Sequence, residues 1–238
     1  PADSQFQQAK RIYEYLVQNV TYDTGEGGLP TECTAYGALV EGRAQCDGFA
    51  AANMMLCALS DIPNIRIFYD GANGAEGHTW NMVSMDGTYY HVDASGGENA
   101  TRAWRDWCIQ NDVSPIPEVI YTCFAMTEEE TMRNAEPLNH IFDGVLPACG
   151  GSEIWPLVYD IVVSDSNLDR FKSMLLDKIT DPQKAYCISV KASDEMLCDL
   201  LFEKIRDGWF QEVLEEKEYY GTYSCYGFED VLYLNLEP

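Results

Sequence analysis

The segment Ala44-Gln45-Cys46-Asp47-Gly48-Phe49-Ala50 places a cysteine at the head of a strongly helical run. The run continues as F-A-A-A-N-M-M-L-C-A-L-S until the residues Ser60-Asp61-Ile62-Pro63 end it. Its many helix formers and its apolar residues at helical spacing predict a helix with one apolar face. Cys46 should therefore lie at a helix N-terminus, where the positive end of the helix dipole stabilises a thiolate.

A β-hairpin is predicted downstream, from two strands at residues 78–85 (H-T-W-N-M-V-S-M) and 88–95 (T-Y-Y-H-V-D-A-S) that flank Asp86-Gly87. An Asp-Gly pair between alternating strands is the strongest short hairpin signal. A two-residue turn implies the pairs Met85–Thr88, Ser84–Tyr89, Met82–His91 and Trp80–Asp93. His78 and Asp93 should then share one face of the sheet as diagonal neighbours, whereas a slip of one residue would separate them.

Cys46, His78 and Asp93 supply a thiol, an imidazole and a carboxylate, the three groups of an activated cysteine nucleophile. Each also has a simple structural explanation when taken alone: a buried thiol, a strand residue with a neighbouring partner, and a turn former at a strand end. Their joint pattern favours the catalytic hypothesis. His91 shares the predicted face of His78, and we interpret it as a supporting or exposed residue.

Three blocks of the sequence, G-R-A-Q-C-D-G-F-A, H-T-W-N-M-V and D-G-T-Y-Y-H-V-D, together resemble the transglutaminase-like superfamily with its papain-like Cys-His-Asp triad. The resemblance covers about residues 5–100 and extends to bacterial members. The matching positions are Gly42, Cys46, Gly48, Phe49, Ala50, His78, Trp80, Asn81, Asp86, Gly87, Tyr90 and Asp93. Many bacterial members continue with a threonine and then Trp-Asp, whereas this chain reads Ala94-Ser95-Gly96-Gly97, so its cleft wall should differ.

The resemblance implies a role for each residue of the triad. Cys46 would attack an amide carbonyl, His78 would move the proton, and Asp93 would orient the imidazole. The Cys46 backbone N–H is a natural oxyanion donor, and Gln45 and Tyr36 are candidates for a second donor. Trp80 is expected as a cleft wall or core aromatic. The mechanism requires no metal and no cofactor.

The bulk composition limits the partners and the location of the protein. The 238 residues carry a net charge of −24, from 39 acidic and 15 basic residues, which disfavours binding to nucleic acid. Apolar runs stay well short of the ~18 residues of a transmembrane helix. The chain starts at Pro1 without an initiator Met, so we expect a mature form that is extracellular or at the cell surface after removal of a signal segment, with the cytoplasm as the alternative. The nine cysteines form no C-x-x-C motif, so a zinc site is not predicted.

The second half of the chain changes character. A short helix is expected at residues 101–110, an extended or strand segment at 119–126 and a helical turn at 127–135, before a linker at 147–151. Residues 157–238 then alternate strand and helix in the order β-α-β-α-β, which predicts a small α/β domain. The predicted division is a transglutaminase-like catalytic domain at 1–147 and an accessory domain of unknown role at 152–238.

The fold class is therefore predicted as α+β: a helix bearing Cys46 packed on an antiparallel sheet, as in papain-like cysteine proteases, followed by the small α/β domain. The predicted function is thiol-dependent acyl transfer or hydrolysis at peptide or glutamine amides through a thioester, on a protein or peptide substrate. Water as acceptor gives a protease or amidase, and an amine gives a cross-linker; the residues leave both open. The alternative is a non-catalytic binding module that retains the fold.

Overall fold

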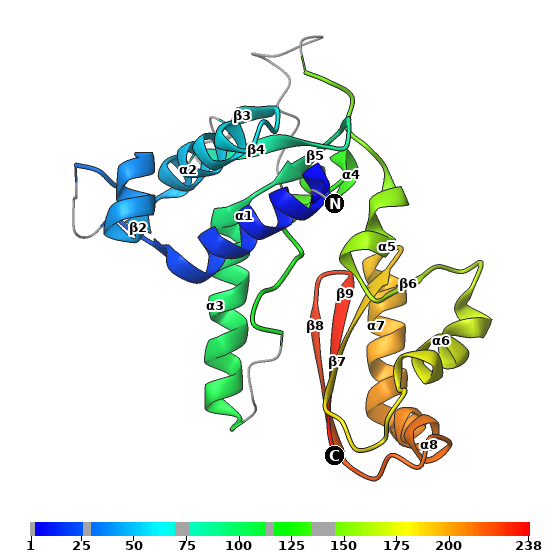
Figure 1. Ribbon diagram of the computed structural model, residues 1–238. Helices are drawn as coiled ribbons and strands as arrows, with labels where there is room; N and C mark the ends of the chain where they lie inside the picture. Colours follow the sequence, from blue (N-terminus) through cyan, green and yellow to red (C-terminus); the bar gives the residue numbers. More distant parts are fainter. Residues whose placement is uncertain (1–2, 26–29, 70–76, 113–116, 135–145) are drawn as a thin grey trace. The chain divides into compact units, whose positions relative to one another are not determined.

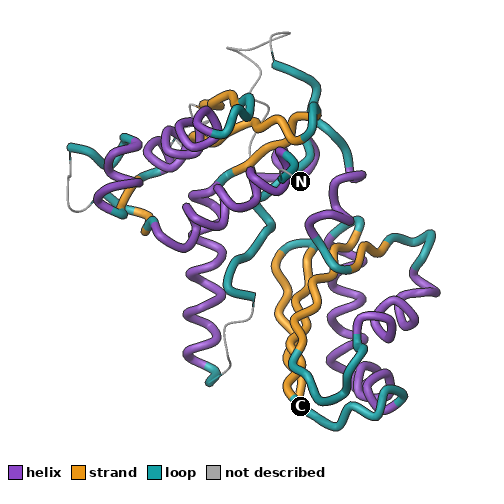
Figure 2. Tube along the Cα trace, in the orientation of Figure 1, coloured by secondary structure: helices purple, strands orange, loops and turns teal. Residues whose placement is uncertain are grey.

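The computed structural model describes residues 3–25, 30–69, 77–112, 117–134 and 146–238. The chain forms two compact units, residues 1–152 and residues 153–238 (Figure 1). Both units combine helices with strands, as the tube in Figure 2 shows, and the predicted α+β class is confirmed. The assignment of a catalytic role to the first unit and an accessory role to the second stays a prediction.

The first unit is built on an antiparallel sheet in the order β3-β4-β5, against which α2 (Cys46–Leu59) packs. The strands are β3 (Asn64–Tyr69), β4 (His78–Met85) and β5 (Thr88–Val92). Helix and sheet are joined by polar contacts, since the buried Asn81 side chain donates to the Ala50 carbonyl oxygen (3.2 Å) and to Asn64 Oδ1 (2.9 Å). The predicted cysteine-bearing helix on an antiparallel sheet is thus confirmed.

The β4–β5 hairpin has the predicted register, with Met85 opposite Thr88, Ser84 opposite Tyr89 and Met82 opposite His91. Asp86 (φ 55°) and Gly87 (φ 95°) both adopt the positive φ that a tight two-residue hairpin turn requires. The last pair of the ladder is Asn81–Val92. Asp93 leaves the strand at that point, so the expected Trp80–Asp93 pair does not form as part of the ladder.

Asp93 instead begins α3 (Ala94–Gln110), where it is the N-cap residue. The expected start of this helix near residue 101 is therefore wrong by about two turns. The two glycines at 96 and 97 weaken the local helix signal, but the carboxylate of Asp93 compensates by accepting the Gly96 N–H at 2.9 Å.

The segment 119–126 is not a regular strand, which corrects the second expectation for this region. It runs beside the outer edge of β5 and makes only an isolated bridge, in which His91 and Met126 exchange backbone hydrogen bonds of 3.0 and 2.9 Å. Asp93 N–H also donates to the Cys123 carbonyl oxygen at 2.9 Å. This segment therefore covers the sheet edge next to Asp93.

The remaining elements of the first unit complete its core. Helix α1 (Gln5–Asn19) begins with a capping box at Ser4 and packs against α2 and α3. Its buried Tyr13 donates to the Ile120 carbonyl oxygen at 2.8 Å, which ties the helix to the segment beside β5. The smaller elements are β1 (Thr21–Tyr22), the π-helical turn η1 (Gly37–Glu41), β2 (Arg43–Ala44) and α4 (Glu128–Asn134).

The second unit has a four-stranded sheet in the order β6-β7-β9-β8, in which only the β6–β7 pair is parallel. Its helices α6, α7 and α8 lie on one side of the sheet (Figure 1), and the predicted strand–helix alternation is confirmed. The elements are α5 (Trp155–Val158), β6 (Ile161–Val163), α6 (Phe171–Lys178), β7 (Tyr186–Ala192), α7 (Glu195–Lys204), α8 (Phe210–Glu215), β8 (Thr222–Phe228) and β9 (Val231–Glu237).

Short helical turns complete this unit: η2 (Ser152–Ile154), η3 (Leu168–Arg170) and η4 (Ile205–Trp209), which joins α7 to α8. None of the helices in the described ranges combines the length and the hydropathy that crossing a bilayer requires.

Candidate active site

Cys46 is the first residue of α2, and its thiol is half-buried. The next residue, Asp47, anchors this end of the helix: its Oδ1 accepts the Thr79 hydroxyl at 3.0 Å and is ion-paired with Arg66. Arg66 comes from β3, and Thr79 follows His78 on β4. Asp47 therefore fixes the thiol next to the strand that carries the imidazole.

Gly48 allows the chain to pass close behind Cys46. A Cβ atom at this position would lie 2.5 Å from the Glu32 carbonyl oxygen and 2.7 Å from the Ala44 Cβ. The same Glu32 oxygen accepts the Gln45 N–H at 2.9 Å. The sequence Cys46-Asp47-Gly48 thus supplies a thiol, an anchor and the room for close packing in three consecutive residues.

His78 and Asp93 meet as the hairpin register predicts. His78 Nε2 lies 2.7 Å from Asp93 Oδ2, with the two side chains 37 % and 14 % exposed. The other carboxylate oxygen of Asp93 accepts Ser95 Oγ at 2.7 Å and Gly96 N–H at 2.9 Å. Cys46 lies close enough to the His78 ring to contribute to its raised pKa. Because Nε2 faces Asp93, Nδ1 is the ring nitrogen left for the thiol.

The electrostatics of the site favour a protonated imidazole at His78. Burial opposes the charge on His78, but hydrogen bonds and negative charges from Asp93 and Cys46 outweigh it and raise the pKa of His78 to about 10. Burial likewise opposes the charge on Asp93, yet the bond and charge of His78, with help from Gly96 and Ser95, hold the pKa of Asp93 below its usual value. At neutral pH, the ring is therefore an imidazolium.

The three further candidates occupy different positions. Trp80 is buried (3 % exposed) and stacks on the His78 ring, with centroids 5.6 Å apart and planes at 28°. Gln45 precedes Cys46, and its Oε1 lies 3.6 Å from Cys33 Sγ. Tyr36 is 56 % exposed, and among the described residues it makes no hydrogen bond to the triad. The oxyanion roles of Gln45 and Tyr36 stay predictions.

A cavity of about 170 Å³ opens beside His78, Trp80 and Asp93, whereas Cys46 is not among its lining residues. Its other wall comes from the segment that follows α3 and from α4. The lining residues are His78, Trp80, Asp93, Cys123, Met126, Glu130 and Thr131. The cavity wall beyond the triad therefore comes from a part of the chain to which the sequence motifs assigned no function.

The sequence analysis missed two sets of residues that build the site. Arg66 and Asp47 anchor the Cys46 end of α2, but an acidic residue in the first turn of a helix is common and gives no sign of its distant partner. Ser95 and Gly96 orient the Asp93 carboxylate. The spacing of Asp93 and Gly96 is compatible with an N-cap, and this was the sequence signal that could have identified their contact.

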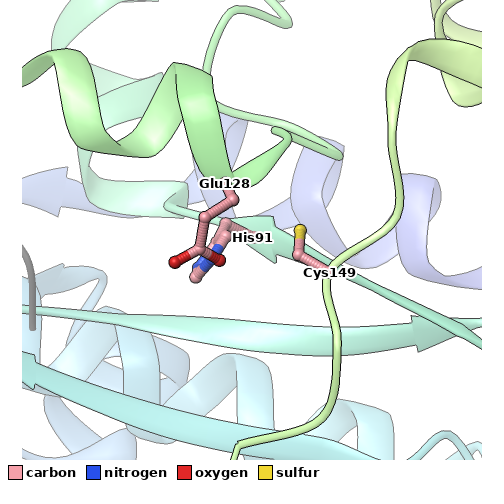
Figure 3. A group of neighbouring side chains, drawn as sticks. All are labelled: His91, Glu128 and Cys149. Carbon is pink, nitrogen blue, oxygen red and sulfur yellow. The ribbon is translucent and has the colours of Figure 1, made fainter. Parts of the chain in front are cut away.

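One further group of side chains has the composition of a metal site. His91, Glu128 and Cys149 converge from β5, from α4 and from the segment after it, as Figure 3 shows. Their potential ligand atoms all lie within 4.8 Å of one another. A zinc ion would accept this donor set on composition alone.

Hydrogen bonding argues against a metal at this group. Trp80 Nε1 lies 3.0 Å from His91 Nδ1, and an indole N–H can only donate, so Nδ1 must accept. The neutral ring then carries its proton on Nε2, which faces Glu128 Oε2 at 3.3 Å and has no lone pair for an ion. Burial, with the charge of Glu128, raises the pKa of Cys149 to about 11, so its thiol is protonated and donates to the Met126 carbonyl oxygen at 3.7 Å. The group fits a hydrogen-bond network better than a metal centre.

Comparison with known proteins bears on the first part of the chain. Residues 1–94 match the family model of the transglutaminase-like superfamily. No curated protein sequence is significantly similar to the chain.

Two solved structures are similar to part of it. The crystal structure of a TGase has 17 % identity and a TM-score of 0.35, covering 40 % of this chain and 27 % of that one. A candidate cysteine protease from Cytophaga hutchinsonii has 22 % identity and a TM-score of 0.31, covering 38 % of this chain and 34 % of that one. The chain thus spans about a third of the length of each.

The family match ends at residue 94, one residue after Asp93. It therefore includes the helix start at Cys46 and the hairpin that begins at His78 and leads to Asp93. The resemblance inferred from the three sequence blocks is confirmed: residues 1–94 of this chain match the transglutaminase-like superfamily.

Proposed function

We propose that the protein catalyses thiol-dependent acyl transfer or hydrolysis at peptide or glutamine amides, with Cys46 as nucleophile, His78 as proton carrier and Asp93 as the group that orients the imidazole. The observation that carries this proposal is the 2.7 Å contact between Asp93 Oδ2 and His78 Nε2, with Cys46 close enough to the same ring to help raise its pKa. The match of residues 1–94 to the transglutaminase-like superfamily supports the same chemistry.

The acylation step follows from the charges of the site. In the proposed step His78, which is protonated at neutral pH, lies beside Cys46, and the Cys46 sulfur attacks the carbonyl carbon of the amide in its thiolate form. The carbonyl oxygen gains the negative charge, which the N–H of Cys46 can stabilise because the first N–H groups of α2 have no partner within the helix. The C–N bond then breaks, and the leaving amine takes the proton of His78.

The second half-reaction starts from the thioester on Cys46 and a neutral His78. The imidazole removes a proton from water, the oxygen attacks the thioester carbonyl, and the C–S bond breaks to release a carboxylic acid and regenerate the thiolate–imidazolium pair. An amine in place of water gives a new amide. Asp93 stays ionised throughout and stabilises the imidazolium.

The proposal predicts that Cys46 reacts with limiting iodoacetamide at pH 7 about tenfold faster than an ordinary exposed thiol. Cys33 is the internal control, because it is exposed and its pKa is raised by burial and by the charges of Asp47, Glu32 and Cys46. Peptide mapping by mass spectrometry measures both rates. In His78→Ala the preference for Cys46 should disappear. Equal and slow labelling of both thiols in the unsubstituted protein would contradict the catalytic proposal and favour a binding module.

A pH dependence follows from the raised pKa of His78. Acylation by an amide needs the protonated ring as acid, so its rate should hold through neutral pH and fall as the pH rises through about 10. Acylation by a p-nitrophenyl ester should persist above that pH, because a phenolate leaves without a proton. Intact-protein mass spectrometry of the acyl-enzyme measures both reactions. A parallel decline of the two substrates above pH 10 would show that His78 is not the acid.

A further inference from the structure

His91 is the most completely enclosed ionisable side chain near the proposed catalytic site. It lies on β5, two residues before Asp93, and is 1 % exposed. Both ring nitrogens have partners: Nδ1 accepts from Trp80 Nε1 at 3.0 Å, and Nε2 faces Glu128 Oε2 at 3.3 Å. Burial lowers the pKa of His91 even though Glu128 opposes this effect, so the ring is neutral at pH 7. Its chemistry is therefore that of a fixed hydrogen-bond acceptor toward Trp80.

Trp80 connects His91 to the proposed proton carrier. The Trp80 indole contacts two histidine rings. It is tilted against His91, with ring centroids 6.2 Å apart, and it stacks on His78, with centroids 5.6 Å apart. The edge of the His78 ring is held by Asp93, but that bond alone leaves the ring free to rotate about the hydrogen-bond axis. The face contact with Trp80 limits this rotation.

The surroundings of Trp80 make the bond to His91 consequential. The indole is buried, so an N–H without an acceptor would be a costly defect that the side chain could relieve only by turning away. The backbone of His91 is also held, through its two hydrogen bonds to Met126. The acceptor is therefore rigidly placed, and it selects one orientation of the indole.

We propose that His91 is a positioning residue: by accepting the Trp80 indole proton, it keeps that ring stacked on His78 and so holds the imidazole in line between Asp93 and Cys46. This inference rests on the proposed function of the triad and assigns to it a residue outside the three. Glu128 and Cys149 complete the polar surroundings of His91, and Asp93 and Cys46 are the charged neighbours of His78.

Two substitutions separate hydrogen bonding from space filling. In His91→Asn the side-chain oxygen reaches the place of Nδ1 and still accepts the indole proton, whereas His91→Leu fills similar space without an acceptor. The readout is the rate of Cys46 alkylation by iodoacetamide between pH 5 and 10, mapped by mass spectrometry with Cys33 as internal control. We expect His91→Leu to lower the rate at pH 7 by about tenfold and to move the profile toward that of an ordinary thiol. His91→Asn should stay within about threefold of the unsubstituted protein.

A substitution at Trp80 keeps the test independent of how well His91→Leu folds. Trp80→Phe retains an aromatic ring against His78 but removes the donor, and we expect it to reproduce the loss seen in His91→Leu. Combining the two should cause no further loss, because both remove the same bond. Circular dichroism and the temperature of unfolding verify that each variant is folded.

The outcomes distinguish this inference from the proposed function. If the unsubstituted protein shows no preference for Cys46 over Cys33, the proposed function itself fails. If Cys46 is activated and remains so in His91→Leu with an unchanged pH profile, only the positioning role of His91 is overturned. Equal losses in the Asn and Leu variants would also overturn it, since the acceptor would then not be what matters.

Discussion

Replacing Asp93 by asparagine is expected to lower the rate of acylation at Cys46 by between about 10²- and 10⁴-fold. The carboxylate both orients His78 and stabilises its positive charge, through the 2.7 Å contact between Oδ2 and Nε2. An amide in this place has no charge, and its NH₂ group would face Nε2 and favour the tautomer with the proton toward Cys46. The imidazole could then no longer accept a proton from the thiol.

The same residue has a second role that asparagine retains. Asp93 Oδ1 caps α3 by accepting the Gly96 N–H, and asparagine is an equally good N-cap residue. Asp93→Ala removes the cap as well as the charge. We therefore expect the alanine variant to be less stable than the asparagine variant by ~1 kcal/mol, with a similar loss of acylation.

The measurement combines p-nitrophenolate release from an aryl ester with urea unfolding of the same samples at pH 7. Ser95 offers a matched control, because Ser95→Ala removes one bond to Oδ1 and leaves both the cap and the contact with His78. Near-normal acylation in Asp93→Asn would refute the orienting role of the carboxylate. Equal stability of the Asn and Ala variants would refute the capping role.

Lys191→Met is expected to destabilise the unit formed by residues 153–238 by about 3–5 kcal/mol. Lys191 and Asp230 are each 2 % exposed, and Nζ lies 2.6 Å from the carboxylate oxygen. The ammonium also lies over the Trp155 ring at 4.8 Å and near the Tyr159 ring at 5.6 Å. Removing the cation leaves a buried carboxylate without its counter-charge, and this is the main cause of the expected loss.

Two further variants test that explanation. The double variant Lys191→Met/Asp230→Ala should recover most of the lost stability, because it removes the unpaired charge. Lys184→Met removes an exposed lysine 3.8 Å from Asp181 and should change stability by less than ~0.5 kcal/mol.

Hydrogen exchange of β7 and β9 amides reports on this unit of the full chain. If the β7 and β9 amides of Lys191→Met exchanged no faster than those of Lys184→Met and of the unsubstituted protein, the buried ion pair would not contribute to stability. If the double variant were as unstable as Lys191→Met, the loss of stability would come from lost packing and not from the unpaired charge.

The elements with a local cause can be read directly from the order of the residues. The Asp86-Gly87 turn requires positive φ at both residues and so sets the register of β4 and β5. That register, together with the two-residue period of a strand, brings His78 and Asp93 to the same face. The helix formers after Cys46 likewise determine where α2 begins. Each of these rules acts over a few residues, so it can be applied without knowledge of the rest of the chain.

Which distant side chains support that local framework depends on how the whole chain packs. Arg66 binds Asp47 across 19 positions, and the segment 119–126 places the Met126 backbone against His91. Lys191 lies in the core although its residue type predicts a surface position. Partners of this kind depend on which elements pack together. No periodicity or turn signal encodes that choice, because the energy of each contact exists only once both sides are in place.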